Sequence, residues 1–85
     1  MNAEEYVKRI MEMENIAMSF SGVSKAFALS AGREVRVFVD AGSVNDYESE
    51  KLAQEIAGSI EANLNYPGEV KVTLIREKRI VEFAR

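Results

Sequence analysis

Residues 23–40 constrain the fold most strongly, because they contain two short runs of strand-forming residues joined by a small turn. The runs Val23–Leu29 and Glu34–Asp40 are rich in β-branched and aromatic residues, and the sequence Ser-Ala-Gly-Arg connects them. A short connection containing Gly between two such runs is typical of a β-hairpin. We therefore predict an antiparallel pair of strands in which Leu29 lies opposite Glu34.

This register gives the hairpin two unlike faces, because successive side chains of a strand point to opposite sides. One face collects small apolar side chains and is suited to helix packing: Ala26, Ala28, Val35, Val37 and Val39. The other face mixes aromatic, aliphatic and charged side chains: Lys25, Phe27, Leu29, Glu34, Arg36 and Phe38. We predict that the mixed face carries the function of the chain.

Two amphipathic helices are predicted to flank the hairpin. The first runs from residue 2 or 3 to about residue 19. A second, weaker apolar stripe of Val7, Met11 and Met18 is interpreted as part of a wide buried face, in preference to a surface that binds a partner or a preceding segment. The second begins at Asn45, with Glu48 placed for a capping box, and runs to about residue 65. The predicted core positions repeat at helical spacing: Tyr6, Ile10, Met13, Ala17 and Phe20, then Leu52, Ile56, Ile60 and Leu64.

Turn-forming residues separate these elements. Ser21-Gly22 is predicted to end the first helix with Gly22 at C′, and Tyr66-Pro67-Gly68 is predicted to stop the second. Residues 70–75 then alternate as a third strand, with Val70, Val72 and Leu74 facing inward. Residues 80–84 fit either a short fourth strand at the sheet edge or a tail that docks on a neighbour.

The predicted order is therefore helix, strand, strand, helix, strand, in a single domain covering residues 1–85. A right-handed crossover makes the second and third strands parallel. Because a sheet with one apolar face needs its helices there, both helices are predicted to lie on the same side. The predicted fold class is α+β, a two-layer sandwich with two helices on one face of a mixed sheet.

The amino-acid composition limits the kinds of catalytic and ligand-binding site that this chain can form. The 85 residues contain neither cysteine nor histidine, so thiolate nucleophiles, imidazole bases and the usual zinc ligands are excluded. No glycine-rich phosphate loop is present. We predict no catalytic residue, no metal ligand and no cofactor, and no apolar run long enough for direct membrane contact. The element order is similar to metal-sensing domains of cation-efflux transporters, but without His and Cys only hard cations could bind.

Three uses of the mixed face are considered, in order of preference. The first is self-association as a homodimer, with Phe27, Leu29, Arg36, Phe38 and Ile75 as candidate interface residues; burying the four apolar ones fully would contribute roughly 6–12 kcal/mol. The second is coverage by the C-terminal segment of the same chain. The third is single-stranded RNA binding, with bases stacked on the two phenylalanines and Lys25, Arg36 and Lys71 contacting phosphates.

Three separated motifs resemble the C-terminal domain of bacterial ribonuclease Y. They are Ala31-Gly32-Arg33-Glu34-Val35-Arg36-Val37, then Tyr66–Glu77, then Arg79-Ile80-Val81-Glu82-Phe83-Ala84, and the helical segments Glu5–Arg9 and Glu14–Ala17 are similar as well. Members of that family often have Gln before the Ala-Gly-Arg-Glu turn, where this chain has Ser30.

The resemblance implies a parent endoribonuclease of mRNA decay, with a membrane-anchoring helix, a coiled coil, a KH module and a metal-dependent HD domain outside these residues. It implies that this chain is a cytoplasmic, non-catalytic accessory domain of a parent anchored to the inner face of the cell membrane. RNA would be reached through the parent. The implied partners are a second copy and RNA-decay proteins such as a helicase or glycolytic enzymes.

Two Arg-Glu dipeptides, Arg33-Glu34 and Arg76-Glu77, fall within the resembling motifs. One interpretation makes them reciprocal ion pairs at a dimer contact. The other makes them surface charges of turns, each pair contributing about 0–1 kcal/mol. The sequence favours neither.

Overall fold

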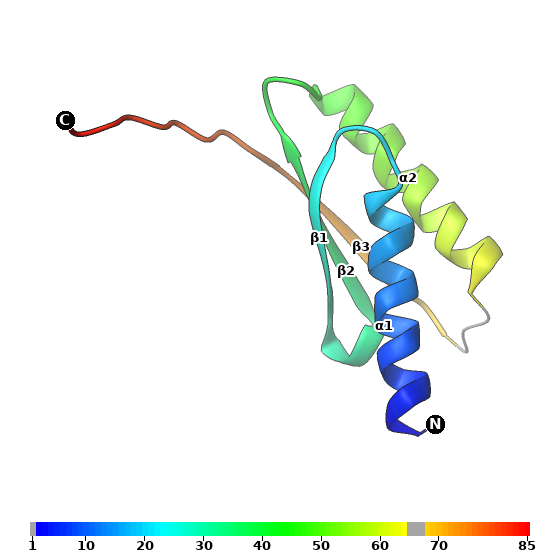
Figure 1. The fold of residues 1–85 in the computed structure, drawn as a ribbon. Coiled ribbons are helices and arrows are strands. Elements are labelled where there is room, and N and C mark those ends of the chain that lie inside the picture. The colour runs from blue at the N-terminus through cyan, green and yellow to red at the C-terminus, as the bar shows by residue number, and fades with distance from the viewer. Residues whose placement is uncertain (1, 65–67) are drawn as a thin grey trace.

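A computed structural model describes residues 2–64 and 68–85 and confirms the predicted order of elements. Figure 1 shows both helices on the same side of the sheet, so the predicted two-layer α+β arrangement is also confirmed. The elements are α1 (Ala3–Met18), β1 (Val23–Leu29), the 3₁₀ turn η1 (Ser30–Gly32), β2 (Glu34–Asp40), α2 (Asp46–Asn63) and β3 (Lys71–Glu77).

The described strands form one mixed sheet in which β2 is central, antiparallel to β1 and parallel to β3. Leu29 pairs with Glu34, as the hairpin pattern predicts. A bulge at Ser24 shifts the register between Val23 and Lys25, and the Ser24 hydroxyl donates a hydrogen bond to the Phe38 carbonyl at 3.0 Å. The extra residue returns the Val23 side chain to the helix side, where it packs against the core.

The core lies between the sheet and the helices. The three valines of β2 are fully buried, because β2 is the central strand and both helices cover its face. The core residues supplied by the helices are Met13, Ala17, Leu52, Ile56 and Ile60. The interpretation of the second α1 stripe as buried is wrong: Val7, Met11 and Met18 are exposed, because only one face of α1 contacts the sheet.

Both helices begin where the sequence predicts, each with an asparagine at the N-cap. The Asn2 side chain accepts a hydrogen bond from the Glu5 N–H, and Asn45 and Glu48 form a reciprocal capping box. The first helix ends at Met18, within one residue of the predicted end, but its C-cap is Ser19 and the prediction of Gly22 at C′ is wrong. Gly22 lies beyond that cap, in the turn into β1, where its φ of 94° explains the need for glycine.

The second helix ends at Asn63, two residues before the predicted boundary. The predicted stop at Tyr66-Pro67 lies outside the described residues. Gly68, the third residue of that motif, has a φ of 104°, which is the conformation expected of a glycine there. β3 starts one residue later than predicted and continues two residues further, to Glu77.

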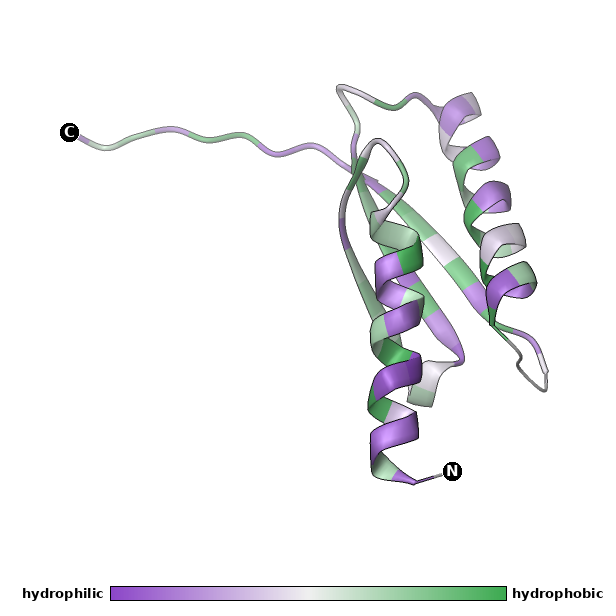
Figure 2. Ribbon diagram, turned by 45° about the vertical axis from the view of Figure 1, so that its right-hand side comes forward, coloured by the Kyte–Doolittle hydropathy of each residue, from purple (hydrophilic) through white to green (hydrophobic). Residues whose placement is uncertain are grey.

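Residues 78–85, which we call the arm, form neither the fourth strand nor the covering segment considered for the mixed face. Figures 1 and 2 show the arm leaving the end of β3 and extending away from the two layers. The sequence Arg76-Glu77-Lys78-Arg79 contains none of the Gly, Pro or Asn residues that reverse a chain, so the backbone continues outward. The hypothesis of internal coverage is therefore wrong.

Gly58 gives a direct test of the helix packing. A Cβ built at this position in α2 meets nothing within 4 Å, so the glycine does not serve close packing. Replacing Gly58 with Ala is expected to stabilise the fold by about 0.5–1 kcal/mol, because alanine loses less backbone entropy in a helix. Urea unfolding measures the change, and a destabilised variant would contradict the open surroundings of this position.

Candidate functional site on the open face of the sheet

The side of the sheet opposite the helices, which we call the open face, carries three cross-strand rows of side chains. Strand pairing places these residues side by side because neighbours in register point to the same face. The rows are Leu29–Glu34–Lys71, Phe27–Arg36–Thr73 and Lys25–Phe38–Ile75. The structure thus brings all five candidate interface residues, and the three candidate RNA-contacting residues, onto one surface.

An aromatic pair lies at the centre of the open face. The rings of Phe27 and Phe38 are 6.1 Å apart at an interplanar angle of 75°, an edge-to-face contact. The Lys25 ammonium lies 4.6 Å from the centroid of the Phe38 ring, within range of a cation–π interaction. Phe27 is 48% exposed, whereas Leu29, Phe38 and Ile75 are partly covered by their neighbours.

Charged groups lie on either side of this apolar centre. Toward the start of β2, Glu34 accepts hydrogen bonds from the Thr73 hydroxyl at 3.0 Å and from Arg36 at 3.2 Å. Toward the end of β3, the Glu77 carboxylate contacts Lys25 at 3.8 Å and Arg79 at 3.1 Å. Two of the three candidate RNA-contacting cations therefore already face a carboxylate of their own chain.

The pKa of Glu34 is lowered, chiefly because the Thr73 hydroxyl donates to the ionised carboxylate and secondarily because of Arg36. A folded-state pKa below the unfolded value means that this stabilisation is complete above the unfolded pKa and is lost as pH falls through the folded pKa. Replacing Thr73 with Val is expected to raise the Glu34 pKa. An NMR titration of the Glu34 carboxyl measures this, and an unchanged pKa would contradict the role of the hydroxyl.

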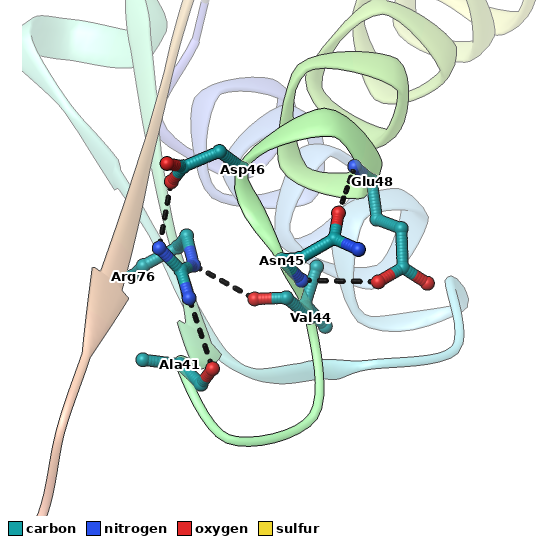
Figure 3. Close-up of polar contacts among 6 residues, drawn as sticks. All are labelled: Ala41, Val44, Asn45, Asp46, Glu48 and Arg76. Atoms are coloured by element: carbon teal, nitrogen blue, oxygen red, sulfur yellow. Dashed lines mark hydrogen bonds and ion pairs between the residues drawn. The ribbon is translucent and has the colours of Figure 1, made fainter.

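Arg76 lies on the helix side of the sheet and holds the loop before α2. Figure 3 shows its guanidinium donating to the Val44 carbonyl at 2.7 Å, to the Ala41 carbonyl at 2.9 Å and to the Asp46 carboxylate at 2.6 Å. The Val44 side chain, next to these hydrogen bonds, is buried. The fixed loop places Asn45 where it caps α2, so Arg76 joins the end of β3 to the start of the second helix.

The four residues of the two Arg-Glu dipeptides do not gather into one cluster within the chain. Arg76 and Glu77 are neighbours in a strand and point to opposite faces. Glu34 is paired with Arg36, and Arg33 contributes backbone hydrogen bonds, accepting from the Lys71 N–H at 2.8 Å. Their part in a contact between two copies stays a prediction, although Arg76 has a clear role inside the fold.

Glu14 has a role that the sequence pattern did not reveal. Its carboxylate accepts a hydrogen bond from the Ala28 N–H at 2.9 Å, at the outer edge of β1. The helix pattern predicts a solvated acid at this position, and the only sequence signal is that Glu14 follows the buried Met13. The contact protects part of one sheet edge from pairing with another strand.

Among residues 2–64 and 68–85, no group of three or more Asp, Glu, His or Cys side chains is placed to hold a metal ion. Within the same residues, none of the helices has the length and apolarity required to cross a membrane.

Comparison with known proteins gives one consistent result. The chain is 56% identical over 82 residues to "Ribonuclease Y" of Lawsonia intracellularis and 57% identical over 82 residues to "Ribonuclease Y" of Wolinella succinogenes, matches that cover 96% of this chain. It is 52% identical over 80 residues to "Ribonuclease Y" of Borreliella burgdorferi. The chain spans only 16% of the length of each of these relatives.

Comparisons with protein-family models and with solved structures gave no match. The sequence identities nevertheless extend across both helices and all three strands described above. Over nearly its whole length, this chain is homologous to a segment of Ribonuclease Y.

Proposed function

We propose that this chain is a non-catalytic C-terminal accessory domain of a ribonuclease Y-like endoribonuclease of mRNA turnover, and that it joins two copies of the parent through the open face. The homology to Ribonuclease Y supports the identity of the parent. The observation that carries the role is the apolar group on the open face, namely Phe27, Phe38 and Ile75, which no helix covers. The absence of histidine and cysteine from the sequence supports a non-catalytic role.

Self-association is favoured over RNA binding by the charges of the open face. A single-strand platform needs cations free to contact phosphates, and its affinity depends on their number. Lys25 and Arg36 already lie beside Glu77 and Glu34, so the open face offers little net positive charge. Apolar contact between two copies requires no such excess.

The open face alone supports only a weak dimer. Complete burial of an exposed Leu, Ile or Phe contributes about 1.5–3 kcal/mol. Three of the four candidate apolar residues are already partly covered, so the gain is smaller than the roughly 6–12 kcal/mol expected for exposed side chains. Association costs about 4–15 kcal/mol in lost freedom. A stable dimer therefore needs additional surface.

Sedimentation equilibrium over about 1 μM to 1 mM chain tests the proposal. We expect the average mass to rise from one chain to two. A chain that stays monomeric across this range contradicts the proposal. Fluorescence titration with labelled single-stranded RNA at low salt tests the alternative, which predicts binding that weakens as salt is added.

A further inference from the structure

The arm is the most exposed apolar segment among the described residues. Ile80, Val81 and Phe83 are 62–74% exposed, and no described element packs against them. These residue types favour a strand paired with neighbours. Figure 1 shows the arm continuing outward from β3, clear of its own sheet. The arm therefore has the composition of a strand and lacks a partner strand in its own chain.

The two edges of the sheet differ in their readiness to accept such a strand. At the outer edge of β1, Glu14 already occupies the Ala28 N–H. No described strand lies on the outer side of β3. On its inner side, the Lys71 N–H donates to Arg33 and the Glu77 carbonyl accepts from Ala41. Odd-numbered residues of β3 thus face β2, and the backbone groups of residues 72, 74 and 76 point to the open edge.

The arm and this edge match in length. β3 has seven residues, and eight follow it in the arm. Because the arm continues the line of β3, a twofold axis near their junction lays the arm of each copy antiparallel along β3 of the other. Such a contact is self-complementary, as a symmetric dimer requires. It adds buried surface at the edge of the sheet, next to the open face.

Contacts within the arm indicate which side chains it brings to the open face. Glu77 contacts Lys25 of the open face and also Arg79, two residues along the chain. Farther on, the Arg85 guanidinium lies 5.5 Å from the Phe83 ring centroid. These spacings of two place odd-numbered residues on one side, as in an extended strand. Val81 and Phe83 therefore lie on the side that continues the open face.

Side-chain chemistry selects a register. Odd-numbered residues of the arm must pair with odd-numbered residues of β3 if their side chains are to lie on the same face of the joined sheet. With Arg79 on the axis, Phe83 lies opposite Ile75 and Glu82 lies opposite Arg76. Moving the axis to residue 78 instead places Arg85 opposite Lys71, a like-charge pair that is unfavourable. The arm has a net charge of +2 and the whole chain −3, so residues 1–77 carry −5 and attract the partner's arm.

We propose that two copies of this chain exchange their arms, each arm adding as a strand to the outer edge of β3 in the other copy. The inference rests on the proposed self-association and specifies its structural basis. The exchange yields one continuous sheet across both copies and brings Phe83 of one copy beside Ile75 and Phe38 of the other. Strand addition of this kind combines backbone hydrogen bonds with side-chain contacts.

Cysteine crosslinking tests the geometry cleanly, because the chain has no cysteine of its own. Residue 79 forms a non-hydrogen-bonded pair with itself across the axis, with Cα atoms about 4.5 Å apart. A disulfide spans that separation. Arg79→Cys is therefore expected to form a disulfide-linked dimer under mild oxidation, whereas Arg85→Cys, six residues from the axis, is expected to stay unlinked. Linkage at 85 without linkage at 79 would overturn the exchange.

Removing residues 78–85 tests arm exchange separately from the proposed self-association. The shortened chain, and the full-length double variant Val81→Thr/Phe83→Thr, are each expected to raise the dimer Kd by at least about 100-fold. Far-UV circular dichroism checks that both remain folded. Tyr47→Thr, which removes an equally exposed ring from α2, is the control and is expected to leave the Kd unchanged. If the variants dimerise like the parent chain, arm exchange is wrong while self-association stands; if the unmodified chain is monomeric, both fail.

Discussion

Replacing Phe38 with Thr is expected to raise the dimer dissociation constant by about 100-fold or more. Phe38 lies on the central strand of the open face, next to Ile75 on one side and Lys25 on the other. In a twofold dimer the substitution removes apolar contact from both copies, about 3 kcal/mol in total, which corresponds to that change in Kd. Sedimentation equilibrium of the 85-residue chain measures it.

Threonine is chosen at this position because, like phenylalanine, it is enriched in strands, and because it introduces no charge beside Lys25. The fold is expected to survive, since Phe38 lies outside the core between sheet and helices. Tyr47→Thr again serves as the matched control, removing an exposed ring from a different surface. A Phe38→Thr chain that dimerises as tightly as the control would exclude the open face from the interface.

Replacing Arg76 with Ala is expected to destabilise the chain by about 2–4 kcal/mol. The substitution removes the donor for two backbone carbonyls of the loop before α2, at Ala41 and Val44. Hydrogen bonds from a charged group contribute about 1.5–3 kcal/mol each, and partial exposure of the guanidinium lowers that figure here. Domains of this size are stable by only about 4–13 kcal/mol, so the loss is large.

Thermal unfolding at fixed chain concentration measures this effect, and a fall in Tm of about 10–20 °C is expected. Asp46→Ala is the informative control. The Asp46 side chain is 93% exposed, so its ion pair with Arg76 contributes about 1 kcal/mol or less. If the two substitutions lower the Tm by the same amount, the stabilisation comes from the ion pair and not from the hydrogen bonds of Arg76 to the loop carbonyls.

The hairpin shows how much of the fold can be predicted from residue pattern. Alternation of side chains in residues 23–40 fixes which residues share a face, and the Leu29–Glu34 register follows from a short turn. The capping-box pattern of Asn45 and Glu48 predicts the start of α2, because these side chains satisfy backbone N–H groups that the end of a helix leaves unpaired. These are local rules, and they hold here.

The larger errors concern contacts between distant segments. The helical stripe of Val7, Met11 and Met18 has the composition of a buried face, but the position of α1 on the sheet leaves it exposed. In the sequence, Arg76 is interpreted either as part of an ion pair between two copies or as a surface charge of a turn. The crossover instead brings it to the loop before α2, 30 to 35 residues back along the chain. The carboxylate of Glu14 caps a strand edge that only tertiary packing brings near.

The amino-acid sequence by itself determined the order of elements, the two faces of the hairpin and the homology to Ribonuclease Y, because these depend on periodicity, turn chemistry and residue identity. Only the tertiary structure decided that the arm leaves its own sheet, that one sheet edge is partly protected while the other is open, and that Arg76 holds the second helix in place. Each of these depends on where segments distant in sequence meet in space, and a local pattern of residues does not specify that meeting.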